Sequence, residues 1–202
     1  MIFSTQMNFF SKTLAVAALS VAAIASPASA GEAGPYIRAE IGTGFNSEVN
    51  GEISGIDFDA DGRTTLGGGI GIGYDTGANI RLELGVSRST ADINSVKISG
   101  VKYDVDESGE AWGVDTRFFY DFANASDFTP YVGTGIGLSW GDDTNDTVYS
   151  IPVMAGVSYA ATESVDVFGQ VTYAMTPAQD VDGIDYDYNG EFGVSMGIRF
   201  SL

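Results

Sequence analysis

The 202-residue chain carries 27 acidic and 9 basic residues, which gives a formal net charge of −18 at pH 7. A protein this acidic is not expected to bind nucleic acid or an anionic surface through its bulk charge. The chain has no cysteine, so disulfides cannot hold it together after secretion. Its 27 glycines and 12% aromatic residues favour an all-β domain, stabilised by backbone ladders and burial.

The first thirty residues have the pattern of a secretory signal peptide. Lys12 precedes an apolar run at 14–24, and Ala28-Ser29-Ala30 supplies the small residues of a cleavage site. The apolar run is too short for a helix that spans a bilayer. We therefore expect residues 1–30 to be a cleaved leader and residues 31–202 to form one domain.

The rest of the chain contains eight segments in which apolar and polar residues alternate. A period of two is typical of a strand with one apolar and one polar face. Tilted strands of about 9–11 residues cross a bilayer, and bacterial single-chain barrels have an even number of strands. An unpaired apolar edge is an aggregation site, so we expect the last segment to close the sheet against residues 36–45. The eight segments are 37–42, 65–74, 80–87, 112–120, 131–140, 149–159, 165–173 and 192–202.

The connections between these segments alternate in length. Short connections are expected at 75–78, 121–127 and 161–164, and long ones at 46–63, 89–109, 141–147 and 176–188. Short turns on one side and long loops on the other match the periplasmic turns and extracellular loops of membrane barrels. Pro152 lies within the sixth segment, where it removes a ladder hydrogen bond, so we expect a bulge or a strand end there.

Alternation fits a soluble barrel with an apolar interior as well as a membrane barrel with a polar one, but side-chain volume favours the second. The interior of eight strands is only just wide enough for side chains to fill it. Bulky residues such as Trp112, Phe118 and Trp140 share the apolar face and would overfill that space. Glycines on the polar face leave room in a lumen for longer polar side chains: Gly67, Gly69, Gly71, Gly73, Gly133, Gly135 and Gly137. We predict an eight-stranded antiparallel up-and-down β-barrel with an apolar, lipid-facing exterior and a polar, packed lumen.

Charged residues on the polar face support this assignment. Four arginines lie there beside five acidic residues, in a chain that otherwise has few cations. Arginine–carboxylate pairs satisfy charge and hydrogen bonds together, as a narrow lumen requires. The alternative is a solvated face with chance charges. The predicted lumen charge network consists of Arg38, Glu40, Arg81, Glu83, Asp115, Arg117, Asp166, Glu191 and Arg199.

Aromatic residues gather near both ends of the predicted strands. Two aromatic girdles that flank an apolar band are typical of membrane barrels, whereas β-propensity alone explains the presence of these residues but not their positions. The inner group is Tyr74, Tyr120, Tyr159 and Phe200, and the outer group is Trp112, Trp140, Tyr149 and Tyr173.

Several short motifs, taken in order, resemble the OmpA-like eight-stranded outer-membrane β-barrel family. They are the signal peptide, Tyr120-Asp121-Phe122, Thr129-Pro130-Tyr131-Val132-Gly133, Gly156-Val157-Ser158-Tyr159 and the C-terminal residues 195–202. The resemblance implies a porin-family barrel in the outer membrane of a Gram-negative cell, surrounded by lipid and lipopolysaccharide and inserted by the barrel assembly machinery. We expect a monomer with no nucleic-acid partner. The resemblance identifies Gly197, Phe200 and Leu202 as the assembly signal, with Leu202 where the family usually has Phe.

We do not expect the chain to be an enzyme. Some small outer-membrane barrels are palmitoyl transferases, deacylases, phospholipases or proteases, and the resembled families use a histidine as base or as partner of the nucleophile. This chain has neither histidine nor cysteine. A serine or threonine without a positioned base is a poor nucleophile near neutral pH.

The long connections are strongly acidic and raise the question of a cation site. Seventeen of the 27 acidic residues lie in or next to them. Asp57, Asp59 and Asp61 precede Gly62 as in the first half of a calcium loop, but Gly68 stands where an EF-hand needs its bidentate glutamate. No EF-hand is therefore expected, and no cofactor beyond a looser Ca²⁺ site. Its candidate ligands are Asp57, Asp59 and Asp61, or the cluster Asp180, Asp182, Asp185 and Asp187; the alternative is a solvated acidic rim.

These observations favour an integral outer-membrane barrel with a structural or surface-display role. The alternatives are a narrow passive pore for small solutes, a loop-mediated adhesin or divalent-cation-binding surface protein, and a secreted lipocalin-like carrier.

Overall fold

The computed structural model describes residues 33–45, 48–53, 56–98, 101–141, 147–177, 179–181, 184–188 and 190–202. Side chains are described for these residues except 48–64, 91–94, 96–98, 105–107 and 179–188. The predicted leader and its cleavage site therefore lie outside the described residues. Within the described part, no helix is both long and apolar enough to cross a membrane.

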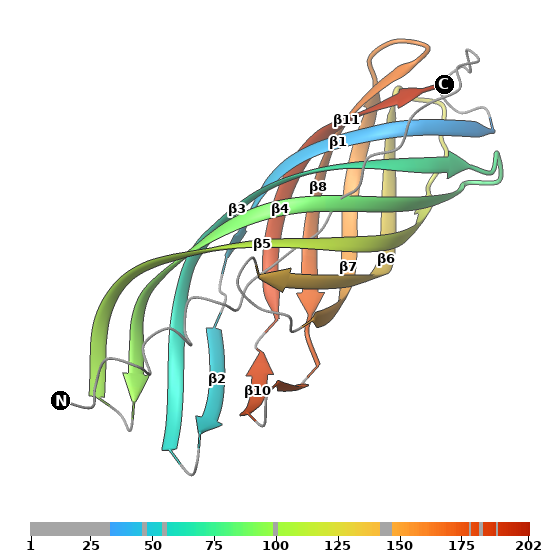
Figure 1. Cartoon of the computed structure of the whole chain (residues 1–202). Coiled ribbons are helices and arrows are strands. Elements are labelled where there is room, and N and C mark those ends of the chain that lie inside the picture. The colour runs from blue at the N-terminus through green and yellow to red at the C-terminus, as the bar shows by residue number, and fades with distance from the viewer. Residues whose placement is uncertain are drawn as a thin grey trace.

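Eight antiparallel strands close into a barrel (Figure 1). Strand β1 pairs with both β3 and β11, so the sheet has no open edge around the barrel. The predicted fold class is confirmed, as is the pairing of the last strand with the first, which runs from Tyr36 opposite Ser201 to Phe45 opposite Phe192. The barrel strands are β1 (Gly34–Phe45), β3 (Ile56–Asp75), β4 (Ile80–Ile98), β5 (Val101–Asp121), β6 (Phe128–Gly141), β7 (Val148–Ala160), β8 (Val165–Met175) and β11 (Glu191–Ser201).

Short turns lie at one end of the barrel, which we call the inner end. The turn at 76–79 contains Gly77 at φ 72° and Asn79 at φ 62°, a left-handed conformation that these two residue types tolerate best. The Asp75 carboxylate accepts a hydrogen bond of 2.8 Å from Gly77 N. In the second turn, Asn124 Oδ1 accepts one of 2.8 Å from Ser126 N. The predicted short connections are confirmed.

The opposite, outer end differs from the prediction at several connections. Residues 89–109 are mostly strand, because β4 and β5 continue as a long hairpin beyond the barrel (Figure 1). These strands have 19 and 21 residues, well above the about 9–11 that cross a bilayer. Three further strands extend the sheet from β3 in the order β2, β10, β9: β2 (Glu48–Ile53), β9 (Gln179–Val181) and β10 (Ile184–Tyr188). These strands have only 6, 3 and 5 residues and lie in acidic segments, so the sequence pattern indicated loops.

Pro152 interrupts the ladder between β6 and β7. The pairs Thr134–Val153 and Gly137–Ser150 flank the interruption and share one register, so the expected bulge or strand end is wrong. On its other edge Pro152 keeps its place opposite Ala174 of β8. The Thr134 hydroxyl donates a 3.0 Å hydrogen bond to the Pro152 carbonyl, which helps to bridge the gap.

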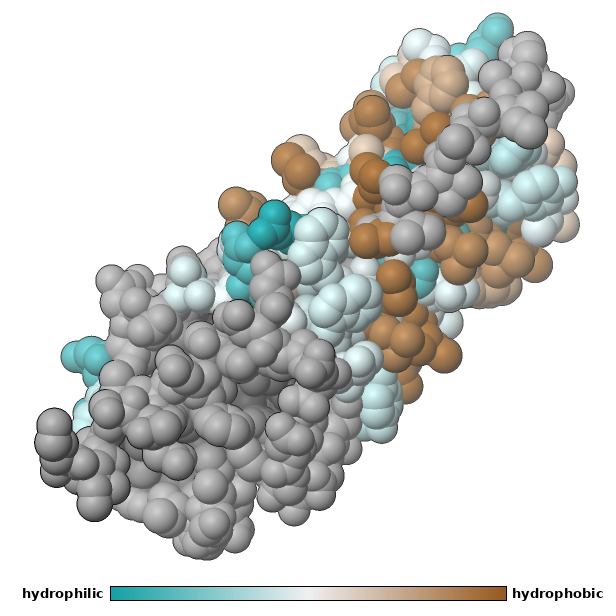
Figure 2. Space-filling model, viewed as in Figure 1, coloured by the Kyte–Doolittle hydropathy of each residue, from teal (hydrophilic) through white to brown (hydrophobic). Residues whose placement is uncertain are grey.

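The apolar face of the barrel points outward and the polar face inward. Outward residues such as Leu66 and Met196 are 64% and 63% exposed, whereas inward Arg81 and Arg199 are 3% and 7% exposed. On the face that Figure 2 shows, most of the apolar side chains lie in one half of the molecule, in patches among polar side chains. An outward apolar face of this kind is typical of a barrel in lipid, because soluble monomers rarely expose large contiguous apolar patches.

Glycines on the inward face lie beneath aromatic rings. Each ring belongs to the residue directly opposite on the neighbouring strand, in the pairs Tyr36–Gly73, Phe119–Gly133, Tyr131–Gly156 and Phe168–Gly197. A Cβ at any of these glycines would collide with the ring. The expected room for polar chains is present as well, since Asp115 lies over Gly85 and Glu191 over Gly44. The lumen therefore holds aromatic as well as charged side chains.

Candidate functional site

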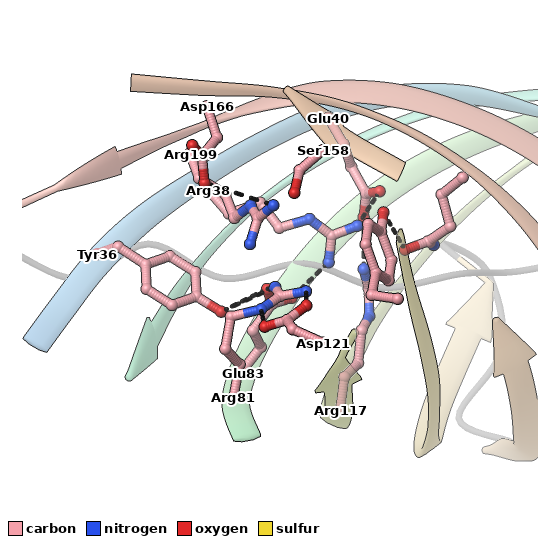
Figure 3. Close-up of polar contacts among 12 residues, drawn as sticks. Tyr36, Arg38, Glu40, Arg81, Glu83, Arg117, Asp121, Ser158, Asp166 and Arg199 are labelled. Atoms are coloured by element: carbon pink, nitrogen blue, oxygen red, sulfur yellow. Dashed lines mark hydrogen bonds and ion pairs between the residues drawn. The ribbon is translucent and has the colours of Figure 1, made fainter. Parts of the chain in front are cut away.

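The inner half of the lumen is filled by a chain of ion pairs (Figure 3). Arg38 of β1 contacts Glu83 of β4 at 2.6 Å and also pairs with Glu40 on its own strand. Glu40 accepts a 2.8 Å hydrogen bond from Arg117 of β5. Arg117 Nε also lies 2.5 Å from Asp115 Oδ2. The alternation of each strand points these side chains inward, and the barrel brings residues 77 positions apart into contact.

Two residues that the sequence prediction omitted complete this chain. Asp121 accepts a bidentate pair of hydrogen bonds from Arg81, at 2.6 Å from Nε and 2.7 Å from Nη2. The Tyr36 hydroxyl donates a 2.7 Å hydrogen bond to Glu83, which also contacts Arg81 at 3.3 Å. Asp121 was assigned to a turn, although it continues the inward series of Asp115 and Arg117 by a period of two. Tyr36 has the same inward phase as Arg38.

Aromatic rings cover the faces of the guanidinium groups. Arg38 lies 4.8 Å from the centre of the Phe168 ring, and Arg81 lies 4.8 Å from Phe119 and 5.0 Å from Tyr131. Phe119 meets Tyr131 edge to face at 5.5 Å. Carboxylates thus satisfy the edges of the guanidinium planes and rings cover their faces, an arrangement suited to buried arginine.

The structure brings most, but not all, of the nine predicted lumen residues together. Arg38, Glu40, Arg81, Glu83, Asp115 and Arg117 form the connected chain just described. Arg199 and Asp166 form a separate, looser pair at 3.5 Å, on neighbouring positions of β11 and β8. Glu191 lies apart from both, over Gly44 near the outer end. We use the name ionic layer for the whole set, which comprises the connected chain, Tyr36, Asp121 and the pair formed by Arg199 and Asp166.

A cavity of about 160 Å³ lies on the outer side of the ionic layer. Glu40, Asp115 and Arg117 belong to the ionic layer and also line the cavity. They therefore mark the boundary between a filled inner lumen and a hollow outer one. The cavity exists because the inward residues of the outer strand halves are mostly glycine, serine and threonine.

The predicted calcium ligands cannot be placed as a site. The backbones of Asp57, Asp59 and Asp61 belong to β3, but their side chains lie outside the described residues. The side chains of Asp180 in β9 and of Asp185 and Asp187 in β10 also lie outside the described residues, and Asp182 is not described at all. Among the described side chains no group of three or more metal-ligating residues occurs.

The three residues of the predicted assembly signal lie at the inner end of β11. Gly197 faces the lumen beneath Phe168, and Phe200 is 48% exposed on the lipid face. Leu202 N donates a 3.0 Å hydrogen bond to the Pro35 carbonyl, so the chain end is tied to the first strand.

Comparisons with known proteins agree with this architecture. The family model described as "Outer membrane protein beta-barrel domain" matches residues 14–200. Uncharacterized proteins of Brucella abortus (strain 2308) and Brucella suis biovar 1 (strain 1330) are 26% identical over 199 residues, covering 83% of this chain and 67% of each relative.

Two solved structures share the fold. The outer membrane protein OprG from Pseudomonas aeruginosa has a TM-score of 0.64 at 15% identity, covering 84% of this chain and 97% of that one. Neisserial surface protein A has a TM-score of 0.53 at 20% identity, covering 83% of this chain and 97% of that one. At these identities the similarity concerns the fold alone.

Proposed function

Because the chain belongs to the outer membrane protein β-barrel domain family, we propose that it is a structural outer-membrane protein that displays its outer segments and neither catalyses a reaction nor conducts solutes. The observation that carries this proposal is the ionic layer. Ion pairs run without a break from Arg117 through Glu40, Arg38 and Glu83 to Arg81, and aromatic rings fill the space around them. A lumen filled in this way is expected to block a continuous water path through its inner half.

A non-catalytic role is supported by the side chains that are present. The whole sequence lacks histidine and cysteine. The inward carboxylates Glu40, Glu83 and Asp115 are each held by arginine, which keeps them occupied as ion-pair partners rather than free as general bases.

The remaining features of this role follow from the family and the sequence pattern. Residues 1–30 act as a leader removed during export, and the barrel assembly machinery reads the signal of Gly197, Phe200 and Leu202. The folded protein is a monomer in contact with lipid and lipopolysaccharide. Deletion of Leu202 is expected to slow assembly in cells strongly, while the loss of its one terminal hydrogen bond to Pro35 lowers the melting temperature of purified, refolded protein only slightly.

A narrow passive pore is the second candidate, and the hollow outer lumen favours it. Single-channel recording in planar bilayers separates the two. The purified protein is expected to give no stable openings, whereas a variant with Arg38→Ser and Phe168→Gly, which removes one stacked pair from the ionic layer, should conduct. Heat-modifiable migration on a gel confirms that each sample is folded. Stable openings of the unmodified protein would refute the display role in favour of the pore.

A further inference from the structure

The outer half of the lumen is hollow although the inner half is filled. The cavity of about 160 Å³ has a floor formed by Glu40, Asp115, Arg117, Met154 and Gln170. A void of this size holds on the order of ten water molecules or one small organic solute. The cavity is therefore large enough to be a binding site, and its wall chemistry decides for what.

Serine and threonine residues whose buried hydroxyl oxygens have no hydrogen-bond partner among the described residues line this cavity. Thr65, Ser87 and Ser89 are 5%, 9% and 4% exposed, and their hydroxyl oxygens have no hydrogen-bond partner among the described residues. The hydroxyl of Ser195 on β11 is a fourth such group. Buried polar groups without partners are uncommon and costly. A serine hydroxyl reorients by rotation about a single bond, so these groups can turn toward a molecule in the cavity.

The lining of the cavity carries more carboxylates than guanidinium groups. Glu40, Asp115 and Glu191 contribute carboxylates and Arg117 a guanidinium, while Arg38 pairs with Glu40 from the ionic layer beneath. The whole ionic layer beneath it also has one carboxylate more than it has arginines, because Asp121 joins Glu40, Glu83, Asp115 and Asp166 against four guanidinium groups. The acidic outer segments add to this field, which raises the local concentration of cations and excludes anions.

We propose that the outer lumen cavity binds a small organic cation that carries an ammonium group. An ammonium has three hydrogen-bond donors and no acceptor, so it suits carboxylate and hydroxyl oxygens. Glu40 and Asp115 at the floor are paired with arginine, but each carboxylate has about four lone-pair sites and can still accept a hydrogen bond from the ammonium. The serine and threonine hydroxyls accept the remaining hydrogen bonds. This site is independent of the display role and goes beyond it.

Three molecules of equal size test the charge selectivity. The folded protein in a neutral maltoside detergent is titrated with ethanolammonium chloride, ethylene glycol and sodium glycolate, and the amide resonances of Ser87, Ser89 and Ser195 are followed by NMR. Ethanolammonium is expected to give saturable shifts at these amides. Ethylene glycol and glycolate should bind about tenfold more weakly or not at all.

Two pairs of variants locate the site. Gly193→Leu fills the cavity, and its Cβ meets only ordinary contacts at 3.5 and 3.9 Å, while Gly169→Leu adds the same side chain where nothing lies within 4 Å. Asp115→Asn removes a carboxylate from the floor, and Asp166→Asn removes one from the ionic layer away from the cavity. Ethanolammonium binding should be lost in the first member of each pair and kept in the second.

The alternative outcomes overturn the proposal. Equal binding of ethanolammonium and ethylene glycol would mean that the cavity does not select for charge. Shifts that do not saturate, or that survive Gly193→Leu in a folded sample, would mean that the cavity holds only water. Should Asp115→Asn fail to fold, the Gly193→Leu and Gly169→Leu pair still decides the question.

Discussion

Glu83 is the position at which the ionic layer can be tested most directly. Its carboxylate is 4% exposed and accepts short hydrogen bonds from Tyr36 at 2.7 Å and Arg38 at 2.6 Å. Hydrogen bonds to a charged group contribute about 1.5–3 kcal/mol each, and breaking a buried ion pair costs about 3–5 kcal/mol. Glu83→Ala should therefore lower the free energy of unfolding by about 3–5 kcal/mol.

Two further substitutions separate charge from packing in this test. Glu83→Gln keeps the side-chain volume and one acceptor for Tyr36 but removes the charge opposite Arg38. We therefore expect it to lower the free energy of unfolding by about 1.5–3 kcal/mol. Glu163→Ala removes an exposed carboxylate from the turn at 161–164 and should cause no measurable change.

The assay is urea unfolding of the refolded protein in lipid vesicles, followed by tryptophan fluorescence and by heat-modifiable migration on a gel. Both tryptophans, Trp112 and Trp140, belong to barrel strands, so their emission reports on the barrel itself. If Glu83→Ala lowers the free energy of unfolding by less than about 1 kcal/mol, or by as much as Glu163→Ala does, the ionic layer does not stabilise the barrel.

Three more predictions use the same preparation. Gly197→Ala should destabilise the barrel by about 1–3 kcal/mol, because its Cβ would lie 2.2 Å from the Ala39 carbonyl oxygen and 2.5 Å from Phe168 Cζ. Gly169→Ala, in open space, should not, and equal urea midpoints for the two variants would contradict the close packing around Gly197. Met196→Arg on the lipid face should cost about 2–4 kcal/mol, whereas Asp127→Arg in a short turn should be tolerated; a neutral Met196→Arg would argue against a lipid-facing belt. If Asp57, Asp59 and Asp61 bind calcium, calorimetric titration should give saturable heat and the melting temperature should rise. Both effects should vanish when these three residues are changed together to asparagine. No heat with the unmodified protein would reject this site.

Much of the fold could be predicted because it rests on local patterns. A period of two decides which residues share a face. The difference in side-chain volume between the glycine-rich face and the face that carries the tryptophans decides which one points inward. The three small strands β2, β9 and β10 were missed because they have only 6, 3 and 5 residues, so a period of two has little length over which to appear. Their pairing depends on neighbours in the sheet, which a local pattern does not contain.

Alternation along each strand is enough to place Arg38, Arg81, Arg117 and Arg199 on the inward face, because side-chain direction is a property of each strand alone. Only the closed barrel decided which carboxylate each one meets. Register places Phe168 opposite Gly197 and leaves Asp121 level with Arg81, so rings and ion pairs interlock in the inner lumen. The outer lumen stays hollow because small residues from many strands come level there, and that coincidence exists only when the strands are wound into one cylinder.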